Sequence, residues 1–344
     1  MRLDCELMRI ALLGTGVMGR AVLSSFVAAE GVSSMVVTDV RGEAARATAA
    51  EYSGSDVAVT ASARNSDAVS GADVVVFAVK PQHMAELLTQ VHDAIGPGTL
   101  VVSIAAGLET SFYAQRLPED VAIVRVMPNT PATIGQGVAA ISTGPGADDS
   151  HLDLVERLFA GTGLVVRVPE HQQSIVTAVS GSGPAYVFHL IDALAEAGTA
   201  GGLPRALALQ LAAHTVAGSG AYAVDSGSHP ALLREAVSSP GGTTLAALAV
   251  LDDRAVRAAT WLLGIELAHH DGVRGRRLAQ VLGVHRRDPA GREPSRLGQA
   301  SGEGGQRRDN NNLHQLRLSY RQQTPEEQVL QLRDIPLLPR HNHN

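Results

Sequence analysis

Short apolar runs alternate with helix-spaced segments through the first half of the chain. The runs are rich in β-branched residues and lie at Ile10–Leu13, Met35–Thr38, Val57–Val59, Val74–Phe77, Leu100–Ser103 and Ala122–Val126. Between them, stretches such as 21–29 and 84–95 repeat apolar residues at helical spacing. Strands that are apolar throughout and separated by helices are typical of a parallel sheet covered on both faces. The pattern therefore predicts a doubly wound α/β domain over residues 8–168.

Beyond residue 168 the pattern changes to helices rich in Ala, Leu and Gly. The helix-spaced stretches cover 185–197, 205–224 and 230–236, and Pro184, Pro204 and Pro230 stand at their starts. Proline is tolerated in the first turn of a helix, where an N–H has no intrahelical partner. We therefore expect an all-helical domain over residues 169–260. Its many small residues suit the close helix packing of an intertwined dimer, with a monomeric bundle as the alternative.

The last part of the chain, 261–344, has a different composition. Residues 284–312 hold clustered Arg, Gly, Pro and Asn, including the run Asn310–Asn312. Such a sequence cannot bury enough apolar surface to offset its chain entropy, so we expect a largely disordered tail. The abrupt change also raises the hypothesis of a shifted reading frame, which sequencing of the gene would test.

Composition and charge narrow the classes of partner. The net charge of the 344 residues is −6, which gives no reason to expect nucleic acid. No uninterrupted apolar run approaches the ~20 residues of a membrane span, and the first residues lack the apolar core of a signal peptide. Cys5 is the only cysteine, so a reducing compartment is expected. We therefore expect a cytoplasmic protein that binds neither membrane nor nucleic acid.

A glycine-rich turn follows the first predicted strand. Its residues are Gly14, Thr15, Gly16, Val17, Met18 and Gly19, which match the dinucleotide fingerprint G-x-G-x-x-G. The glycines allow a tight turn, close approach of the backbone to a pyrophosphate and close helix–strand packing. The following helix offers free N–H groups to the phosphates. Because the match lies between a strand and a helix, it predicts a Rossmann-type domain that binds NADPH or NADH.

Two side chains at the end of the second predicted strand bear on the choice of cofactor. Asp39 lies where an acid usually accepts the ribose hydroxyls of NADH and repels a 2′-phosphate. Arg41 lies two residues further on, where a guanidinium could pair with that phosphate. These two residues favour different cofactors, so the choice between NADPH and NADH stays open.

Further candidates follow later strands, at the carboxyl edge where such sheets bind cofactors. Ala78, Val79, Lys80 and Pro81 follow the fourth strand. Proline biases the preceding residue toward an extended conformation, so Lys80, the only lysine, should leave the strand end toward the site. Asn129, in the turn Met127–Ala132 after the sixth strand, is a polar group held between two prolines and aimed at the same site. A solvated lysine and a purely structural turn are the alternatives.

Two segments of the helical part combine glycines with hydroxyl groups. Val179–Tyr186 reads Val-Ser-Gly-Ser-Gly-Pro-Ala-Tyr and surrounds an expected helix break. Ser238–Thr244 reads Ser-Ser-Pro-Gly-Gly-Thr-Thr and precedes an expected helix. Its bare backbone N–H groups could hold a carboxylate, and the hydroxyls of Thr243 and Thr244 could reach neutral groups. A helix-capping loop would contain the same residue types.

Taken in order, these segments resemble the pyrroline-5-carboxylate reductase family over about residues 8–258. Many reductases share the glycine-rich turn, whereas Ser180–Tyr186 and Ser239–Thr244 together are far more specific. The resemblance implies a Rossmann domain followed by a helical dimerisation domain, with homodimers that can assemble into rings. It also implies that NAD(P)H reduces the C=N bond of 1-pyrroline-5-carboxylate to L-proline, the last step of proline biosynthesis. Members often use NADPH, which favours that cofactor here.

The resemblance also assigns roles at the substrate. Thr244 corresponds to the catalytic threonine whose hydroxyl meets the substrate nitrogen. The amides of Gly242 and Thr243 and the hydroxyl of Ser239 correspond to groups that hold the substrate carboxylate. Glu170 corresponds to an acid near the substrate ring.

On the cofactor side, Asn65 and the stretch Ala78–Pro81 correspond to cofactor contacts of the family. Hydride transfer to the carbon of a C=N bond requires alignment of the two reactants, and it requires no side-chain nucleophile. The sequence contains no spaced His and Cys cluster, so no metal site is expected.

Two departures from the family pattern leave alternatives open. Gln173–Thr177 reads Gln-Ser-Ile-Val-Thr where the family usually has Leu-Asp-Ala-Val-Thr, and the chain beyond residue 260 does not continue the family's Ala-rich helix. An inactive dinucleotide-binding homologue is one alternative, and a reductase of a β-hydroxy acid or of a larger cyclic imine is another. The hydroxy-acid enzymes need a catalytic lysine in the helical domain, which this chain lacks.

Overall fold

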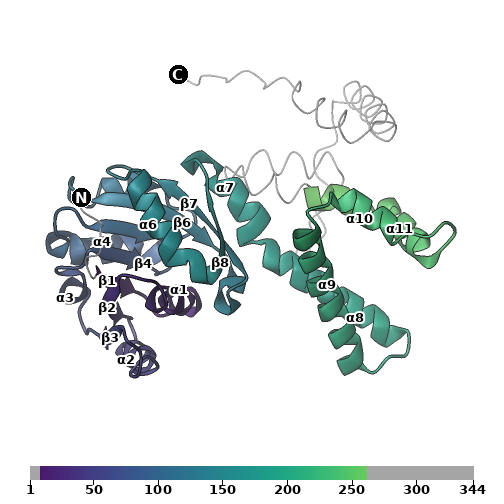
Figure 1. The fold of residues 1–344 in the computed structure, drawn as a ribbon, viewed down its shortest axis with the longest axis horizontal. Helices are drawn as coiled ribbons and strands as arrows, with labels where there is room; N and C mark the ends of the chain where they lie inside the picture. The colour runs from purple at the N-terminus through teal and green to yellow at the C-terminus, as the bar shows by residue number, and fades with distance from the viewer. Residues whose placement is uncertain (1–7, 262–344) are drawn as a thin grey trace, which may run out of the picture. The chain divides into compact units, whose positions relative to one another are not determined.

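Eight strands form one sheet in the computed structural model, which describes residues 8–261 (Figure 1). The strands are β1 (Met8–Leu13), β2 (Val32–Thr38), β3 (Ala58–Ala61), β4 (Val74–Phe77), β5 (Leu100–Ser103), β6 (Ala122–Pro128), β7 (Gly137–Thr143) and β8 (Gly163–Arg167). Their order in the sheet is β3-β2-β1-β4-β5-β6-β7-β8. The first six are parallel, and β1 and β4 are the neighbours at which the strand order changes direction. Doubly wound sheets bind their ligands at the carboxyl ends of such strands.

Helices cover both faces of this sheet. They are α1 (Val17–Val27), α2 (Gly42–Ala50), α3 (Asn65–Val69), α4 (Met84–Val91), α5 (Thr110–Ala114) and α6 (Asp149–Phe159). Alternate residues of β1 enter two different core clusters: Ile10 and Leu12 join residues of α1 and α6, while Ala11 and Leu13 join residues of α3, α4 and α5. A strand buried on both faces is apolar throughout, which explains the continuous runs in the sequence. The predicted α/β fold is confirmed.

The last two strands differ from the rest in direction. β7 pairs antiparallel with β6, and β8 pairs parallel with β7. The reversal occurs through the 3₁₀ turn Thr130–Ile134, which ends at Gly135 with φ +68°. The apolar runs predicted strands only as far as Val126, so these two strands extend the sheet beyond those that the pattern named individually.

The chain after β8 is helical. It forms a 3₁₀ turn (Glu170–Gln172), α7 (Gln173–Val176), a π-turn (Thr177–Gly181), α8 (Gly183–Ala200), α9 (Arg205–Ser226), α10 (Pro230–Ala236) and α11 (Thr243–Asp253). The predicted helix break corresponds to the π-turn and a bend at Ser182. The helix is distorted at this point, and α8 begins at the next residue without an intervening loop. Pro184 and Pro230 lie in the first turns of α8 and α10, whereas Pro204 is the residue before α9.

Most large apolar side chains of these helices are exposed in the single chain. α8 and α9 share a small core of Ala195, Ala208 and Ala212. By contrast, Phe188 of α8 is 61% exposed and Leu211 of α9 is 51% exposed. The stretch Glu170–Ala200 has a mean hydropathy of 1.2 over its best window, and its 31 residues are long and apolar enough to cross a membrane by length and composition alone. The expectation that no membrane is bound stays a prediction.

Residues 1–7 and 262–344 lie outside the described part of the chain. The expectations about Cys5, about a disordered tail and about a shifted reading frame concern these residues. Only Trp261, the first residue of the expected tail, is described, and it is helical.

Candidate functional site

The glycine-rich turn joins β1 to α1 with an open helix end. Gly16 is the N-cap of α1, and no side chain caps the first turn, which holds no acidic residue. The first N–H groups of a helix have no partner within the helix, and the dipole there favours negative charge. An uncapped glycine N-terminus is therefore suited to a phosphate group.

Each glycine of the turn meets a different requirement. Gly14 has φ +110°, and a Cβ at this position would lie 2.7 Å from the carbonyl oxygen of Ala78. A Cβ at Gly19 would collide with the carbonyl oxygen of Gly14. A Cβ at Gly16 would meet nothing within 4 Å. The first and third glycines allow close packing within the protein, and the middle one faces open space where a pyrophosphate fits.

Asp39 follows β2 directly and is held by three hydrogen-bond donors. Thr15 donates its backbone N–H and its hydroxyl to Oδ2 at 2.9 and 3.0 Å, and the backbone N–H of Arg41 donates to Oδ1 at 3.0 Å. Burial opposes ionisation of this carboxyl, but the hydrogen bonds from Arg41 and Thr15 outweigh it and hold the pKa of Asp39 below its usual value. Asp39 is therefore an ionised acceptor at the cofactor end of the sheet.

The remaining predicted cofactor residues lie at the same strand ends. The Ala78 amide donates to the carbonyl of Leu13 at 2.9 Å, which joins the end of β4 to the end of β1. Lys80 is exposed and extended, with φ −66° and ψ 145°, as the sequence predicts for a residue before proline, and Pro81 begins a 3₁₀ turn. Asn65 accepts from the Thr38 hydroxyl at 2.6 Å, at the start of α3. Their contacts with a cofactor stay predictions.

Asn129 connects the sheet to the π-turn. Its Nδ2 donates to the carbonyl and the hydroxyl of Ser180 at 3.2 and 3.1 Å, and its Oδ1 accepts from the Val138 amide at 2.8 Å. The side chain is buried, and its amide is occupied by protein partners. Asn129 thus fixes the position of the π-turn, a feature that often marks functional sites in helices.

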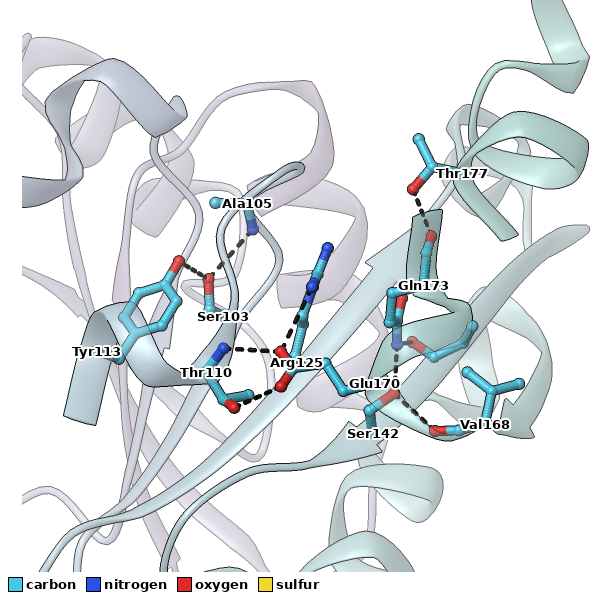
Figure 2. Close-up of polar contacts among 11 residues, drawn as sticks. Ser103, Ala105, Thr110, Tyr113, Arg125, Ser142, Val168, Glu170, Gln173 and Thr177 are labelled. Atoms are coloured by element: carbon cyan, nitrogen blue, oxygen red, sulfur yellow. Dashed lines mark hydrogen bonds and ion pairs between the residues drawn. The ribbon is translucent and has the colours of Figure 1, made fainter. Parts of the chain in front are cut away.

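Glu170 is the centre of a second polar cluster, at the start of the helical part (Figure 2). Its carboxylate accepts from the Thr110 amide and hydroxyl, both at 2.7 Å, and lies 3.4 Å from Nη1 of Arg125. The Arg125 side chain is only 6% exposed. The resemblance implies that Glu170 lies near the substrate ring, and the structure shows its two oxygens engaged by Thr110 and Arg125.

Beside this cluster, a buried serine and tyrosine form a pair that the sequence did not single out. The hydroxyls of Ser103 and Tyr113 lie 2.5 Å apart, and the Ala105 amide lies 3.3 Å from the Ser103 hydroxyl (Figure 2). Burial raises the pKa of Tyr113 to about 12, so the phenol stays protonated at neutral pH. Arg125 could have been noticed in the sequence, because it is the charged residue within the apolar run of β6.

Gln173 explains how one departure from the family pattern is accommodated. The side chain is fully buried, and its Nε2 donates to the Ala140 carbonyl and the Ser142 hydroxyl at 3.1 and 2.7 Å (Figure 2). Ser142 in turn donates to the Val168 carbonyl at 2.7 Å. The glutamine therefore attaches α7 to β7 through its Nε2, in a position where the family usually has an apolar leucine, while its buried Oε1 has no hydrogen-bond partner among the described residues.

The predicted substrate loop is the N-terminus of α11. Gly242 is the N-cap, no side chain caps the turn, and the Gly242 amide donates to the Ser239 carbonyl at 3.0 Å. Gly241 has φ +71°, which favours glycine. Thr243 and Thr244 are the first residues of the helix. The backbone geometry suits a carboxylate.

Most of the candidate residues thus form two groups. One lies at the carboxyl ends of β1, β2 and β4, and the other lies at the N-terminus of α11; among residues 8–261 no hydrogen bond joins them. Asn129, after β6, and Glu170, after β8, lie outside both groups. Within the same range, no cluster of His, Cys, Asp and Glu could hold a metal ion.

Comparison with known proteins identifies relatives for both parts of the chain. The family model for pyrroline-5-carboxylate reductase dimerisation matches residues 170–262, and the model for NADP oxidoreductase, coenzyme F420-dependent, matches residues 9–107. The pyrroline-5-carboxylate reductase of Arabidopsis thaliana is 36% identical over 258 residues, which are 74% of this chain and 91% of that protein. That of Synechocystis sp. is 38% identical over 251 residues, 73% of this chain and 92% of that protein.

Solved structures agree with these relatives. A pyrroline-5-carboxylate reductase from Coxiella burnetii has a TM-score of 0.70 at 29% identity and covers 79% of this chain and 99% of that one. The Plasmodium falciparum pyrroline carboxylate reductase with NADP bound has a TM-score of 0.67 at 24% identity and covers 79% of this chain and all of that one, which shows the shared fold. Since these two relatives exceed a third in identity over 91% and 92% of their own length, the chain belongs to the pyrroline-5-carboxylate reductase family.

Proposed function

We propose that this chain reduces 1-pyrroline-5-carboxylate to L-proline with NADPH or NADH, as the last step of proline biosynthesis. The observation that carries the proposal is the uncapped glycine turn at Gly16, in a chain whose relatives are named for this reaction. The reaction adds a hydride to the ring carbon of the C=N bond and a proton to the nitrogen. The nicotinamide supplies that hydride when it is bound, and the protein aligns the reactants.

The resemblance to the family and the local backbone geometry support the following roles for the chain's own residues. The Thr243 amide and the hydroxyl of Ser239 hold the substrate carboxylate at the start of α11, where Gly242, whose own amide donates to the Ser239 carbonyl, shapes the turn. Thr244 places its hydroxyl at the ring nitrogen, where it orients the C=N bond and hydrogen-bonds the amine that forms. The Gly14–Gly19 turn, Asn65 and the strand end Ala78–Pro81 hold the dinucleotide, and Asn129 supports the site by fixing the π-turn.

A turnover assay tests this proposal. Purified full-length protein is given 1-pyrroline-5-carboxylate with NADPH or NADH, and proline is scored as the product alongside cofactor oxidation. Thr244→Val keeps the shape of the side chain and removes its hydroxyl, so we expect kcat/KM to fall about 100-fold. Thr89→Val, at an exposed threonine of α4, is the matched control and should leave kcat/KM unchanged. Cofactor binding without proline formation in the unaltered protein would refute the proposal in favour of an inactive binder.

We also propose that the chain works as a homodimer in the cytoplasm, formed through the helices α8 to α11. The family model that matches residues 170–262 is one of dimerisation, and the apolar side chains of these helices are exposed in the single chain. A second copy would cover the apolar stretch Glu170–Ala200, so no membrane is needed to cover it, and the net charge of −6 gives no reason to expect a nucleic acid. The mass of the particle in solution separates a dimer from a ring of dimers.

A further inference from the structure

The carboxylate of Asp39 has little capacity left for a ligand. Three donors already reach it: the amide and hydroxyl of Thr15 at Oδ2, and the Arg41 amide at Oδ1. A carboxylate offers about four acceptor positions in total. The side chain is only 11% exposed. An acid that recognises the ribose of NADH must accept hydrogen bonds from the ribose hydroxyls. In Asp39 most acceptor positions are already used by the protein, and most of the side chain is covered.

The positive groups beside it are, in contrast, available. The Arg41 side chain is 77% exposed, and its Nε lies 3.9 Å from Asp39 Oδ1. Arg41 is also the N-cap of α2, which no side chain caps. A second guanidinium stands at the same helix end, since Nη1 of the exposed Arg46 lies 3.3 Å from where a Cβ of Gly42 would be. Exposed guanidinium groups at an uncapped helix start are the chemistry that binds a phosphate.

We propose that Thr15 sets the cofactor selectivity of this chain: by occupying Asp39 it removes the acceptor for the ribose of NADH, and Arg41 with Arg46 then binds the 2′-phosphate of NADPH. The inference rests on the proposed function and adds the choice of cofactor to it. Thr15 acts through Asp39, so it is a positioning residue. Arg41 and Arg46 are the residues that touch the ligand.

The charge balance favours the same result. An unpaired Asp39 would repel a 2′-phosphate across the few ångströms that separate the two groups. With three donors on its oxygens and a guanidinium 3.9 Å away, the negative charge of Asp39 is largely compensated. Glu43, in the first turn of α2, is exposed to solvent.

The test compares nucleotide binding with and without the 2′-phosphate. Isothermal titration calorimetry of the full-length protein with 2′,5′-ADP and with 5′-ADP measures the affinity for the 2′-phosphate without any turnover. The ratio of kcat/KM for NADPH to that for NADH measures the same preference in the reaction. For the unaltered protein we expect at least tenfold preference for the 2′-phosphorylated ligand in both.

Two variants separate the roles. In Thr15→Val the hydroxyl is lost and Asp39 gains a free acceptor position, so the preference should shrink about fivefold to tenfold, mainly because the ligands without a 2′-phosphate bind more tightly. In Arg41→Ser the preference should shrink by a similar factor, but because the 2′-phosphorylated ligands bind more weakly. Thr15→Ser retains a hydroxyl and should restore the preference. Arg116→Ala, at an arginine that lies 4.0 Å from the Phe112 ring, controls for a general change in charge.

A double-mutant cycle completes the test. Asp39→Asn alone should leave NADH affinity within about twofold, because Asp39 is not the ribose acceptor, and Thr15→Val/Asp39→Asn should lose the NADH gain of the single variant. Equal binding of the two ligands by the unaltered protein, or an unchanged preference in Thr15→Val, would overturn the inference. Selective 2′-phosphate binding without proline formation would support the inference on selectivity and refute the proposed function. Proline formation with equal use of both cofactors would support the proposed function and refute the inference.

Discussion

Arg125 is the buried charge of the sheet, and its environment depends on one partner. It lies in β6 among apolar residues, and its guanidinium faces the Glu170 carboxylate, which Thr110 also binds. Removing one member of a buried ion pair leaves the other charge without compensation, which costs more than the pair itself contributes. Glu170 is therefore expected to fasten the start of the helical part to the sheet.

Glu170→Ala tests this role. We expect the free energy of unfolding to fall by about 2–3 kcal/mol, below the usual cost for a fully buried pair because Glu170 is 26% exposed. The double variant Arg125→Met/Glu170→Ala should recover most of that loss, since the buried charge is gone. Urea denaturation measures both, and Glu51→Ala, which breaks the exposed Arg20–Glu51 pair, is the control with an effect of about 1 kcal/mol or less. A raised KM with unchanged stability in Glu170→Gln would instead place Glu170 at the substrate.

At this scale the sequence identified residue types better than partners. The arginine in an apolar run and the acid after the second strand were both visible, but their partners lie 45 and 24 residues away. The two donors from Thr15 reach Asp39 because the ends of β1 and β2 meet, and no local pattern encodes that; only the Arg41 amide is a local donor. The occupied state of Asp39 therefore emerged only from the fold.

Among the elements, α6 has the best-defined start. Asp148 is its N-cap, accepts from the His151 amide at 3.2 Å, and forms a capping box in which the His151 side chain faces the Asp148 amide. Hydrogen bonds from Ser150 and His151 hold the pKa of Asp148 well below its usual value. A carboxyl whose pKa is lowered in the folded state contributes stability above its unfolded pKa, and that contribution is lost as the pH falls through the folded value.

Asp148→Ala and Asp148→Asn test the capping box. Alanine cannot cap the helix, so we expect Asp148→Ala to have a lower Tm at pH 7. Asparagine caps nearly as well as aspartate, so Asp148→Asn should have a Tm close to that of the unaltered protein. The advantage of the unaltered protein over Asp148→Asn should be present at neutral pH and should shrink as the pH falls below about 4, where the aspartate of the unfolded chain becomes protonated. Thermal melts between pH 3 and 7 measure this, and a difference independent of pH would rule out the charged cap.

Strands and helices marked by a clear local sequence pattern were predictable, and elements that depend on non-local contacts were not. β1 to β6 are apolar runs between helices, and the pattern predicted them from the alternation alone. β7 contains Gly137 and two alanines, and it is antiparallel to β6, a pairing that depends on the turn before it. The π-turn at Thr177–Gly181 was expected as a break, because Gly181 and Gly183 are poor helix formers, while the Asn129–Ser180 contact that holds it is non-local.

On the scale of the whole molecule, the exposed apolar helices carry the prediction of a dimer. Phe188→Arg places a charge on the apolar face of α8, and burying that charge against a second copy is costly. We expect the dimer dissociation constant to rise at least 100-fold, measured by light scattering coupled to size exclusion. Leu164→Arg, at a leucine of β8 that is 60% exposed, is the matched control outside the helical part and should leave the mass unchanged. An unchanged mass in Phe188→Arg would remove α8 from the interface.

The contact between α8 and α9 is built from alanines, and this has a consequence for how the enzyme is handled. Ala195, Ala208 and Ala212 bury little apolar area each, so the hairpin draws little stability from its own interior. In the proposed dimer the missing stability comes from the second copy, and it then depends on protein concentration. We therefore expect specific activity to decrease on dilution, and a stock diluted far below the dissociation constant to lose activity with time although no covalent bond in it has been broken.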